Sequence, residues 1–180
     1  MSASDRTAIV LYTMQSLKGE GSWCGETHVQ KTLFLCQEVM GVPSHFKFIL
    51  YKHGPYSFEL SEHLQGLIAD DMICVLTRPP YGPTLGIVEE ARSIAARVER
   101  RDRVAERIAF MSKKLSQKGV ADLEKLATAV YVNKKHGSKV PIEKRTEILV
   151  SLKPHVSVEA ARDAFAEADA IEEEANRLVI

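Results

Sequence analysis

The chain has 180 residues, of which 45% are hydrophobic, and its 24 basic and 24 acidic residues give a formal net charge of zero. A chain of this length can bury one substantial core. No run approaches the roughly 18 apolar residues that a membrane span needs, and Asp5 and Arg6 precede a helical pattern where a secretory signal would be apolar. The composition therefore predicts a globular, cytoplasmic protein with no membrane partner.

The cysteines and the loop GEGSWCG indicate neither a metal site nor a catalytic site. Cys24, Cys36 and Cys74 are odd in number and none belongs to a CxxC pair, which argues against a disulfide framework or a standard zinc site. His28 follows Cys24 by four residues, but no fourth ligand is spaced to join them. The loop does not match GxxxxGK[ST], and no nucleophile motif such as GxSxG is present. We therefore expect no metal, no cofactor and no catalytic residue.

Two helices are predicted before residue 45. Apolar residues at helical spacing predict the first over residues 5–18. Thr27 with Gln30 fits a capping box, which would open a second helix, and Gly41 would help to end it. This second helix would precede the recognition position of a winged helix.

The stretch over residues 45–71 predicts a strand, a sharp corner and a helix. Alternating apolar residues predict a strand over residues 46–51, Gly54 and Pro55 turn the chain, and Ser57 begins a helix. One face of this helix is apolar, through Leu60, Leu64, Leu67 and Ile68. A strand, a turn with the sequence RPPYGP and another strand follow. This order predicts a winged helix, with the Ser57 helix in the recognition position and the hairpin as its wing.

The second half of the chain reads as helical. The predicted helices are a long polar one from about Glu89 to Ser116, an apolar one over residues 123–136, a short one over residues 141–152, and a last one capped by Ser157. No linker or repeat separates the halves. The predicted fold is mainly α with a small β-hairpin: a winged-helix-like N-terminal half (residues 1–90) fused to a helical C-terminal half (residues 91–180) that shares its core.

Several motifs carry a resemblance to a known family. These are QKTLFL (residues 30–35), YKHGPYSFEL (51–60), LATAVY (126–131) and LKPHVS (152–157), so the resemblance covers most of the chain. With them the chain resembles the bacterial YwgA-like family, and more remotely it is similar to the Panacea, or SocA-type, antitoxin domain, which also has a Gly-Pro corner before a helix. The resemblance implies a fold and a regulatory setting, such as a toxin–antitoxin or defence system. It supplies no catalytic residue.

The corner and the helix after it hold the candidate protein-contact residues. In one interpretation the polar side chains around Gly54 and Pro55 only brace the turn, because tyrosine is amphipathic. In the other they form an exposed contact site for a partner protein. These candidates are Tyr51, Lys52, His53 and Tyr56 at the corner, and Glu59, Glu62 and His63 on the polar side of the Ser57 helix.

Charge is distributed unevenly along the chain. Residues 92–118 contain nine basic and three acidic residues, whereas residues 159–177 contain seven acidic and two basic residues. If nucleic acid binds, the candidates are Arg97, Arg100, Arg101, Arg103, Lys134 and Lys135. The recognition-position segment over residues 52–71 has one lysine against four acids and would repel phosphates, and Arg78 is the only basic residue of the predicted wing.

Two functions follow as hypotheses. The first is a non-enzymatic regulatory module that binds another protein. The alternative is a winged-helix transcriptional regulator that binds DNA, which rests on fold analogy. A homodimer is a further option, through pairing of the basic segment of one chain with the acidic segment of another.

Overall fold

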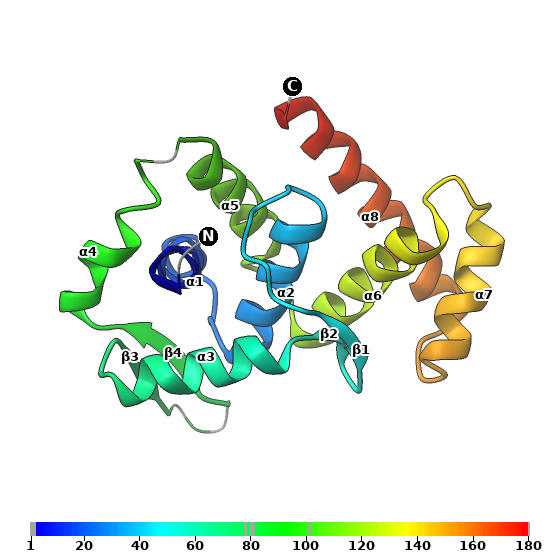
Figure 1. The fold of residues 1–180 in the computed structure, drawn as a ribbon. Helices are drawn as coiled ribbons and strands as arrows, with labels where there is room; N and C mark the ends of the chain where they lie inside the picture. The colour runs from blue at the N-terminus through cyan, green and yellow to red at the C-terminus, as the bar shows by residue number, and fades with distance from the viewer. Residues whose placement is uncertain (1–2, 78, 80–81, 101, 180) are drawn as a thin grey trace.

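The computed structural model describes residues 3–77, 79, 82–100 and 102–179. Within them the protein is mainly helical, with eight α-helices and two small antiparallel hairpins (Figure 1), which confirms the predicted class. The first half comprises α1 (Ala3–Gly19), α2 (Glu26–Glu38), β1 (Ile49–Tyr51), β2 (Gly54–Tyr56), α3 (Phe58–Ala69), β3 (Ile73–Leu76) and β4 (Thr84–Ile87). The second half comprises η1 (Glu89–Ala91), α4 (Arg92–Ala95), α5 (Asp102–Leu115), α6 (Val120–His136), α7 (Ile142–Leu152) and α8 (Val158–Val179). No described helix is long and apolar enough to cross a membrane.

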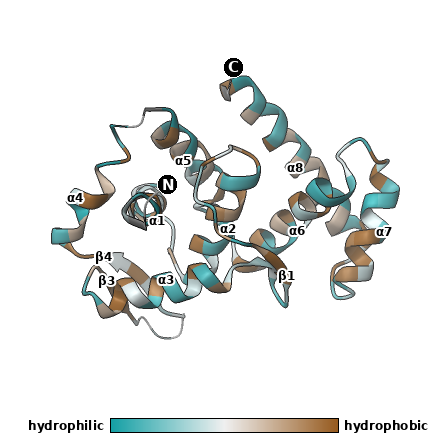
Figure 2. Cartoon of the chain, in the orientation of Figure 1, coloured by the Kyte–Doolittle hydropathy of each residue, from teal (hydrophilic) through white to brown (hydrophobic). Residues whose placement is uncertain are grey.

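Helix α2 occupies the centre of the molecule, against α1, α5 and α6 (Figure 1). Its side chains are buried from His28 to Cys36 without interruption, and only His28, Gln30 and Lys31 of this segment line the two pockets described below. A helix covered on all sides needs side chains that are apolar or hydrogen-bonded throughout. Figure 2 shows hydrophobic residues interspersed with hydrophilic ones along α2 and α6. The two halves of the chain therefore meet across α2.

Strands β1 and β2 form a short hairpin in which Tyr51 pairs with Gly54. Gly54 has a φ of 82°, the positive value that its predicted corner requires. A Cβ atom there would lie 3.0 Å from Thr128 Oγ1 and 3.3 Å from the Glu124 carbonyl oxygen, so the hairpin packs directly on α6. The predicted strand over residues 46–51 was too long, because only its last three residues have a partner strand.

Helix α3 has the start and the buried face that its sequence predicts. Ser57 is its N-cap, and the side-chain oxygen accepts a hydrogen bond from Leu60 N at 3.2 Å. Leu60, Leu64 and Leu67 are buried, and the helix ends before Asp70. The antiparallel β3–β4 hairpin follows, so helix and hairpin come in the predicted order.

The continuous helix predicted from Glu89 to Ser116 is wrong. A short helix ends at Ala95, and α5 begins only at Asp102. Both pieces pack on α1, and the turn between them buries Val98, which is 1% exposed. The bend between them allows both α4 and α5 to pack on α1. Helical periodicity in the sequence does not reveal such a tertiary effect.

The predicted capping box of Thr27 and Gln30 is also wrong. The N-cap of α2 is Gly25, and no side chain caps this helix. Gln30 instead contacts the backbone of Ser57: Nε2 donates to the carbonyl oxygen, and Oε1 accepts from the amide nitrogen, both at 3.0 Å. A tertiary partner has replaced the local one, and it links α2 to the start of α3.

Helices α6, α7 and α8 pack together in the second half. Arg145 is 5% exposed and donates two hydrogen bonds to Asp169, at 2.8 and 2.9 Å, while its guanidinium lies 5.0 Å from the centre of the Phe165 ring. Ser157 caps α8 as predicted, because its hydroxyl accepts from Ala160 N at 3.1 Å.

The basic and acidic segments meet within one chain. Lys114 of α5 lies 2.7 Å from a Glu174 carboxylate oxygen of α8, and Lys118, just beyond α5, lies 2.5 Å from a Glu167 oxygen. Part of the positive charge of residues 92–118 is therefore neutralised inside the protomer.

Candidate functional site

The four predicted contact residues of the corner lie together on the β1–β2 hairpin. Tyr51, Lys52 and His53 are exposed, and Tyr56 is half-buried. Tyr51 and Tyr56 form an aromatic cluster with Phe58, with ring centres 5.9 Å apart for the two tyrosines and 5.4 and 5.1 Å from Phe58. Tyr51 is 46% and Phe58 51% exposed, so this cluster presents apolar surface to solvent. We refer to these three residues as the aromatic cluster.

The three candidates on α3 divide between two environments. Glu59 and Glu62 are exposed on α3, where they line a pocket together with Arg6, and Glu59 Oε2 accepts a hydrogen bond from Lys47 N at 3.3 Å. His63 is partly buried, and its Nε2 lies 3.2 Å from Thr7 Oγ1 of α1. Burial, with a smaller contribution from the nearby positive charge of Arg6, lowers the pKa of His63. His63 therefore contributes to the α1–α3 interface, whereas the two glutamates face outward.

Two buried lysines donate hydrogen bonds to backbone carbonyl groups of the hairpin. Lys31 of α2 is 2% exposed, and its ammonium donates to the Pro55 carbonyl oxygen at 2.8 Å. Lys153, which follows α7 and is 4% exposed, donates to the Tyr51 carbonyl oxygen at 2.9 Å and also to that of Lys52. Each strand of the hairpin is thus fastened by a charged donor from another helical element, and such bonds are stronger than neutral ones.

A buried carboxylate completes this support. Glu124 of α6 is 6% exposed, and its Oε1 lies 3.1 Å from Lys153 Nζ. The ring nitrogens of His53 and His155 approach the same carboxylate, at 3.3 and 3.6 Å. The charge of Glu124 therefore stabilises the ammonium that holds β1, which satisfies the general need of a buried charge for a partner.

The first turn of α2 reaches the other strand. Glu26 Oε1 accepts hydrogen bonds from the Tyr56 hydroxyl at 3.1 Å and from the Ser61 hydroxyl at 2.9 Å. Burial is the main cause that raises the pKa of the Tyr56 phenol. Through Glu26, the aromatic cluster and the second turn of α3 are fixed to the same helix.

A small pocket lies between the hairpin and the start of α2. Its volume is about 260 Å³, and we refer to it as the hairpin pocket. It is lined by Glu26, Thr27, Gln30, Lys31, Tyr51, Lys52, His53 and Tyr56. Burial lowers the pKa of Lys31 to about 8, partly offset by the negative charges of Glu124 and Glu26. The arrangement combines a buried ammonium with an aromatic and hydroxyl-bearing wall.

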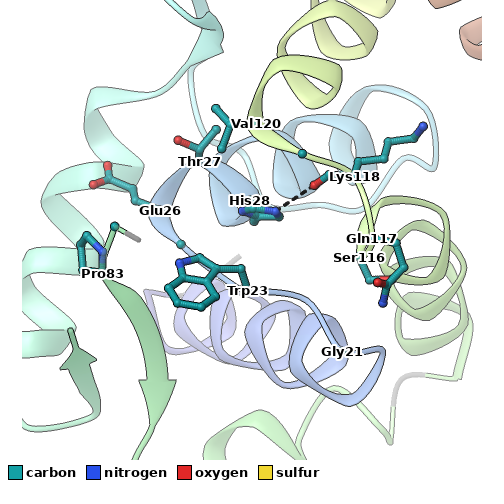
Figure 3. A pocket seen from close by; sticks show the side chains of 13 residues that line it. Gly21, Trp23, Glu26, Thr27, His28, Pro83, Ser116, Gln117, Lys118 and Val120 are labelled. Carbon is teal, nitrogen blue, oxygen red and sulfur yellow. Dashed lines mark hydrogen bonds between the residues drawn. The ribbon is translucent and has the colours of Figure 1, made fainter. Parts of the chain in front are cut away.

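A larger groove of about 640 Å³ also borders the first turn of α2, between Trp23, the segment over residues 116–120 and Pro83. Figure 3 shows it between Trp23 on one side and Thr27 and Val120 on the other. His28 at its base binds the Lys118 carbonyl oxygen through Nε2 at 3.1 Å. Because burial lowers the pKa of His28, the ring is neutral at pH 7 and Nε2 donates the proton in this bond. His28 thus serves as a link between α2 and the start of α6.

All three cysteines are free thiols, and Cys24 Sγ donates to the Met14 carbonyl oxygen at 3.9 Å. Cys24 and Cys36 are buried, and burial raises the pKa of Cys24 to about 12, which disfavours the reactive thiolate. Among the residues that the structure describes, no three His, Cys, Asp or Glu side chains are grouped so as to hold a metal ion.

The nucleic-acid candidates fall on separate elements. Arg97 follows α4 and donates to Ser4 Oγ at 2.8 Å, whereas Arg103 lies on α5. Lys134 and Lys135 are exposed at the end of α6. Arg100 is exposed as well, while Arg78 and Arg101 lie outside the described residues.

The sequence interpretation missed Lys31, Glu124 and Lys153. The partners of Lys153 on β1 lie 101 and 102 residues away, so no local spacing links them. For Lys31 a signal exists, because it stands in a segment whose apolar residues occupy every side of the helix, so a charged residue there is buried and needs partners.

No protein-family model matches the chain, and no curated protein is significantly similar to it. The resemblance to the YwgA-like family stays a prediction. What the residues themselves define is an exposed aromatic cluster on a hairpin that buried charges hold in place.

Proposed function

We propose that the protein is a non-enzymatic recognition module that binds a partner protein through the aromatic cluster. One observation carries this proposal: the exposed rings of Tyr51 and Phe58 pack with the half-buried ring of Tyr56, beside a hairpin whose carbonyl groups are bound by the buried ammonium groups of Lys31 and Lys153. Aromatic side chains dominate the energetics of protein interfaces. A rigid presentation of such side chains reduces the entropy that binding costs.

The surroundings of the cluster define the chemistry of the partner. Ile49, next to it on β1, is 40% exposed and extends the apolar surface. Phe58 of the cluster is followed on the same helix by Glu59 and Glu62, which are exposed and carry negative charge. The partner we infer is a protein segment that places an aliphatic side chain on the aromatic cluster and a lysine or arginine against these glutamates. In the regulatory setting implied by the family resemblance, this partner would be the controlled protein of a toxin–antitoxin or defence system.

The acidic surface of α3 speaks against the DNA-binding alternative. The element order helix, helix, hairpin resembles a winged helix, with α3 in the recognition position. Yet α3 presents Glu59 and Glu62, and phosphate neutralisation by lysine and arginine supplies most nucleic-acid affinity. Lys114 and Lys118, which the basic segment would offer, already pair with acidic residues of α8.

Selection of displayed random peptides on the purified protein tests the proposal. We expect the enriched peptides to combine an aliphatic residue with neighbouring lysine or arginine. Replacement of Tyr51 and Phe58 together by alanine should abolish the enrichment. The matched control replaces Val75 and Leu76, exposed to a similar extent on the other hairpin, and should leave it intact.

Charge reversal separates the two functions. Glu59→Lys with Glu62→Lys should lose the selected peptides, whereas replacement of Arg97, Arg100 and Arg103 by glutamine should retain them. The opposite pattern, with sequence-specific duplex binding that the arginine variant loses, would establish the DNA-binding alternative instead.

A further inference from the structure

The Lys31 ammonium has donors that the protein does not use fully. An ammonium group has three N–H donors, and its hydrogen bond within the protein goes to a neutral acceptor, the Pro55 carbonyl oxygen. Among the described residues, no carboxylate oxygen lies within the 4.0 Å of an ion pair from its Nζ. Burying a charge without an opposite charge costs free energy. The Lys31 ammonium also has unused N–H donors, so binding an anion here would be favourable.

The two nearest carboxylates are engaged elsewhere. Glu124 forms its ion pair with Lys153 at 3.1 Å. Glu26 accepts hydrogen bonds from the Tyr56 and Ser61 hydroxyls at 3.1 and 2.9 Å. Both carboxylates moderate the field around Lys31, yet neither provides the direct contact that would pair it.

The hairpin pocket gives a ligand access to Lys31 and limits its size. Lys31 forms part of the lining of this cavity of about 260 Å³. That volume suits an organic ion of a few carbon atoms.

The lining also selects the charge and the shape of the ligand. Lys52 is a second cation at the rim, whereas Glu26 places one negative charge in the same wall, which disfavours a dianion. The rings of Tyr51 and Tyr56 provide an apolar wall. We propose that the hairpin pocket binds a small aliphatic monocarboxylate, with its carboxylate on the Lys31 ammonium and its short chain against these two tyrosines.

Ligand binding here is a separate function from the proposed partner binding, although Tyr51 and Tyr56 belong both to the pocket wall and to the aromatic cluster. The test titrates the protein, labelled with 13C at the lysine ε-carbons and assigned by triple-resonance NMR, with sodium butyrate at pH 7 and constant ionic strength. Butyramide, of the same shape without the charge, is the control ligand. We expect a saturable shift of the Lys31 resonance with a dissociation constant on the order of 1 mM for butyrate, and no saturable shift for butyramide.

Three variants test the role of each charge. Lys31→Met should weaken butyrate binding by about tenfold or more, whereas Lys52→Met should change it by less than about threefold, because a rim charge is screened by solvent. Glu26→Gln should strengthen it several-fold, because it removes a like charge from the wall. If Lys31→Met does not fold, the butyrate titrations of the wild type and of Glu26→Gln still test whether the hairpin pocket binds the carboxylate. An equal response to butyrate and butyramide, or no saturation up to about 100 mM butyrate, would overturn the proposal.

Discussion

Lys31 makes the stability of the protein depend on pH in the alkaline range. Its pKa is lowered from 10.5 to about 8 in the folded protein, mainly by burial. Between these two values the unfolded chain holds the proton and the folded protein has released it, so the free energy of unfolding rises with pH there. Relative to Lys31→Met, the wild type should gain about 1–2 kcal/mol between pH 8 and pH 10.

Urea unfolding of the wild type and of Lys31→Met at pH 8, 9 and 10 measures this difference. Lys52→Met, which removes an exposed lysine from the same hairpin, should follow the wild type across the series. Parallel pH curves for the wild type and Lys31→Met would mean that the ammonium is not desolvated.

Gly54 is the residue at which backbone geometry matters most. Its φ of 82° disfavours a residue with a Cβ atom, and that atom would meet Thr128 Oγ1 at 3.0 Å. We expect Gly54→Ala to lower the free energy of unfolding by about 1–3 kcal/mol. Gly66→Ala is the matched control, since no atom lies within 4 Å of the added methyl group, and alanine in a helix should instead stabilise by about 0.5–1 kcal/mol. Thermal unfolding of both variants checks the contrast in sign.

At the level of single residues, the sequence predicts those structural roles that depend only on neighbouring residues. The Ser57 and Ser157 caps depend on a hydroxyl and an amide three residues away, and Gly54 depends on its own φ. Lys153 and Glu124 could not be recognised, because their value to the hairpin comes from residues far along the chain that only the folded protein brings near.

Among the elements, α5 and α8 are coupled by charge. Lys114–Glu174 and Lys118–Glu167 join them, but all four side chains retain solvent exposure, so each pair contributes only about 0.2–1 kcal/mol. A double-mutant cycle with Lys114→Gln and Glu174→Gln should give a coupling energy in this range that falls as salt rises from 0.05 to about 1 M.

The pair Glu173 and Arg177, four residues apart within α8, provides the comparison for that cycle. Both residues of this pair lie in α8, so their coupling energy should be unchanged when Lys114 of α5 is replaced. A coupling energy between Lys114 and Glu174 that is zero at low salt would show that the two helices act as independent solvated faces.

The element boundaries show where tertiary packing outweighs the local sequence preferences for helix starts and ends. Periodicity located α3 and α8 because each has one clear apolar face, whereas α1 and α6 were located with the help of Gly19 and Gly137 at their ends. It failed for residues 89–116, where packing of two pieces on α1 bends the chain. It also failed at Thr27 and Gln30, since Gln30 satisfies two backbone groups of Ser57 that would otherwise be buried without partners.

For the whole molecule, the net charge of zero is the sum of basic and acidic regions, and charge is not distributed evenly over the surface. Opposite charges are paired inside the protomer between α5 and α8, while α3 keeps an acidic outer side. The mainly α class followed from the sequence because helical periodicity dominates the chain. The hairpin pocket did not follow, because its walls come from α2 and from a hairpin that packs on α6.

The attachment of Lys153 to the hairpin has a consequence for synthesis on the ribosome. The ammonium reaches the Tyr51 carbonyl oxygen over a separation of 102 residues. At about 5–20 residues per second, β1 therefore emerges roughly 5–20 s before the lysine that fastens it. During that interval the nascent chain carries an aromatic, apolar hairpin without its final support, which is the kind of surface that chaperones bind.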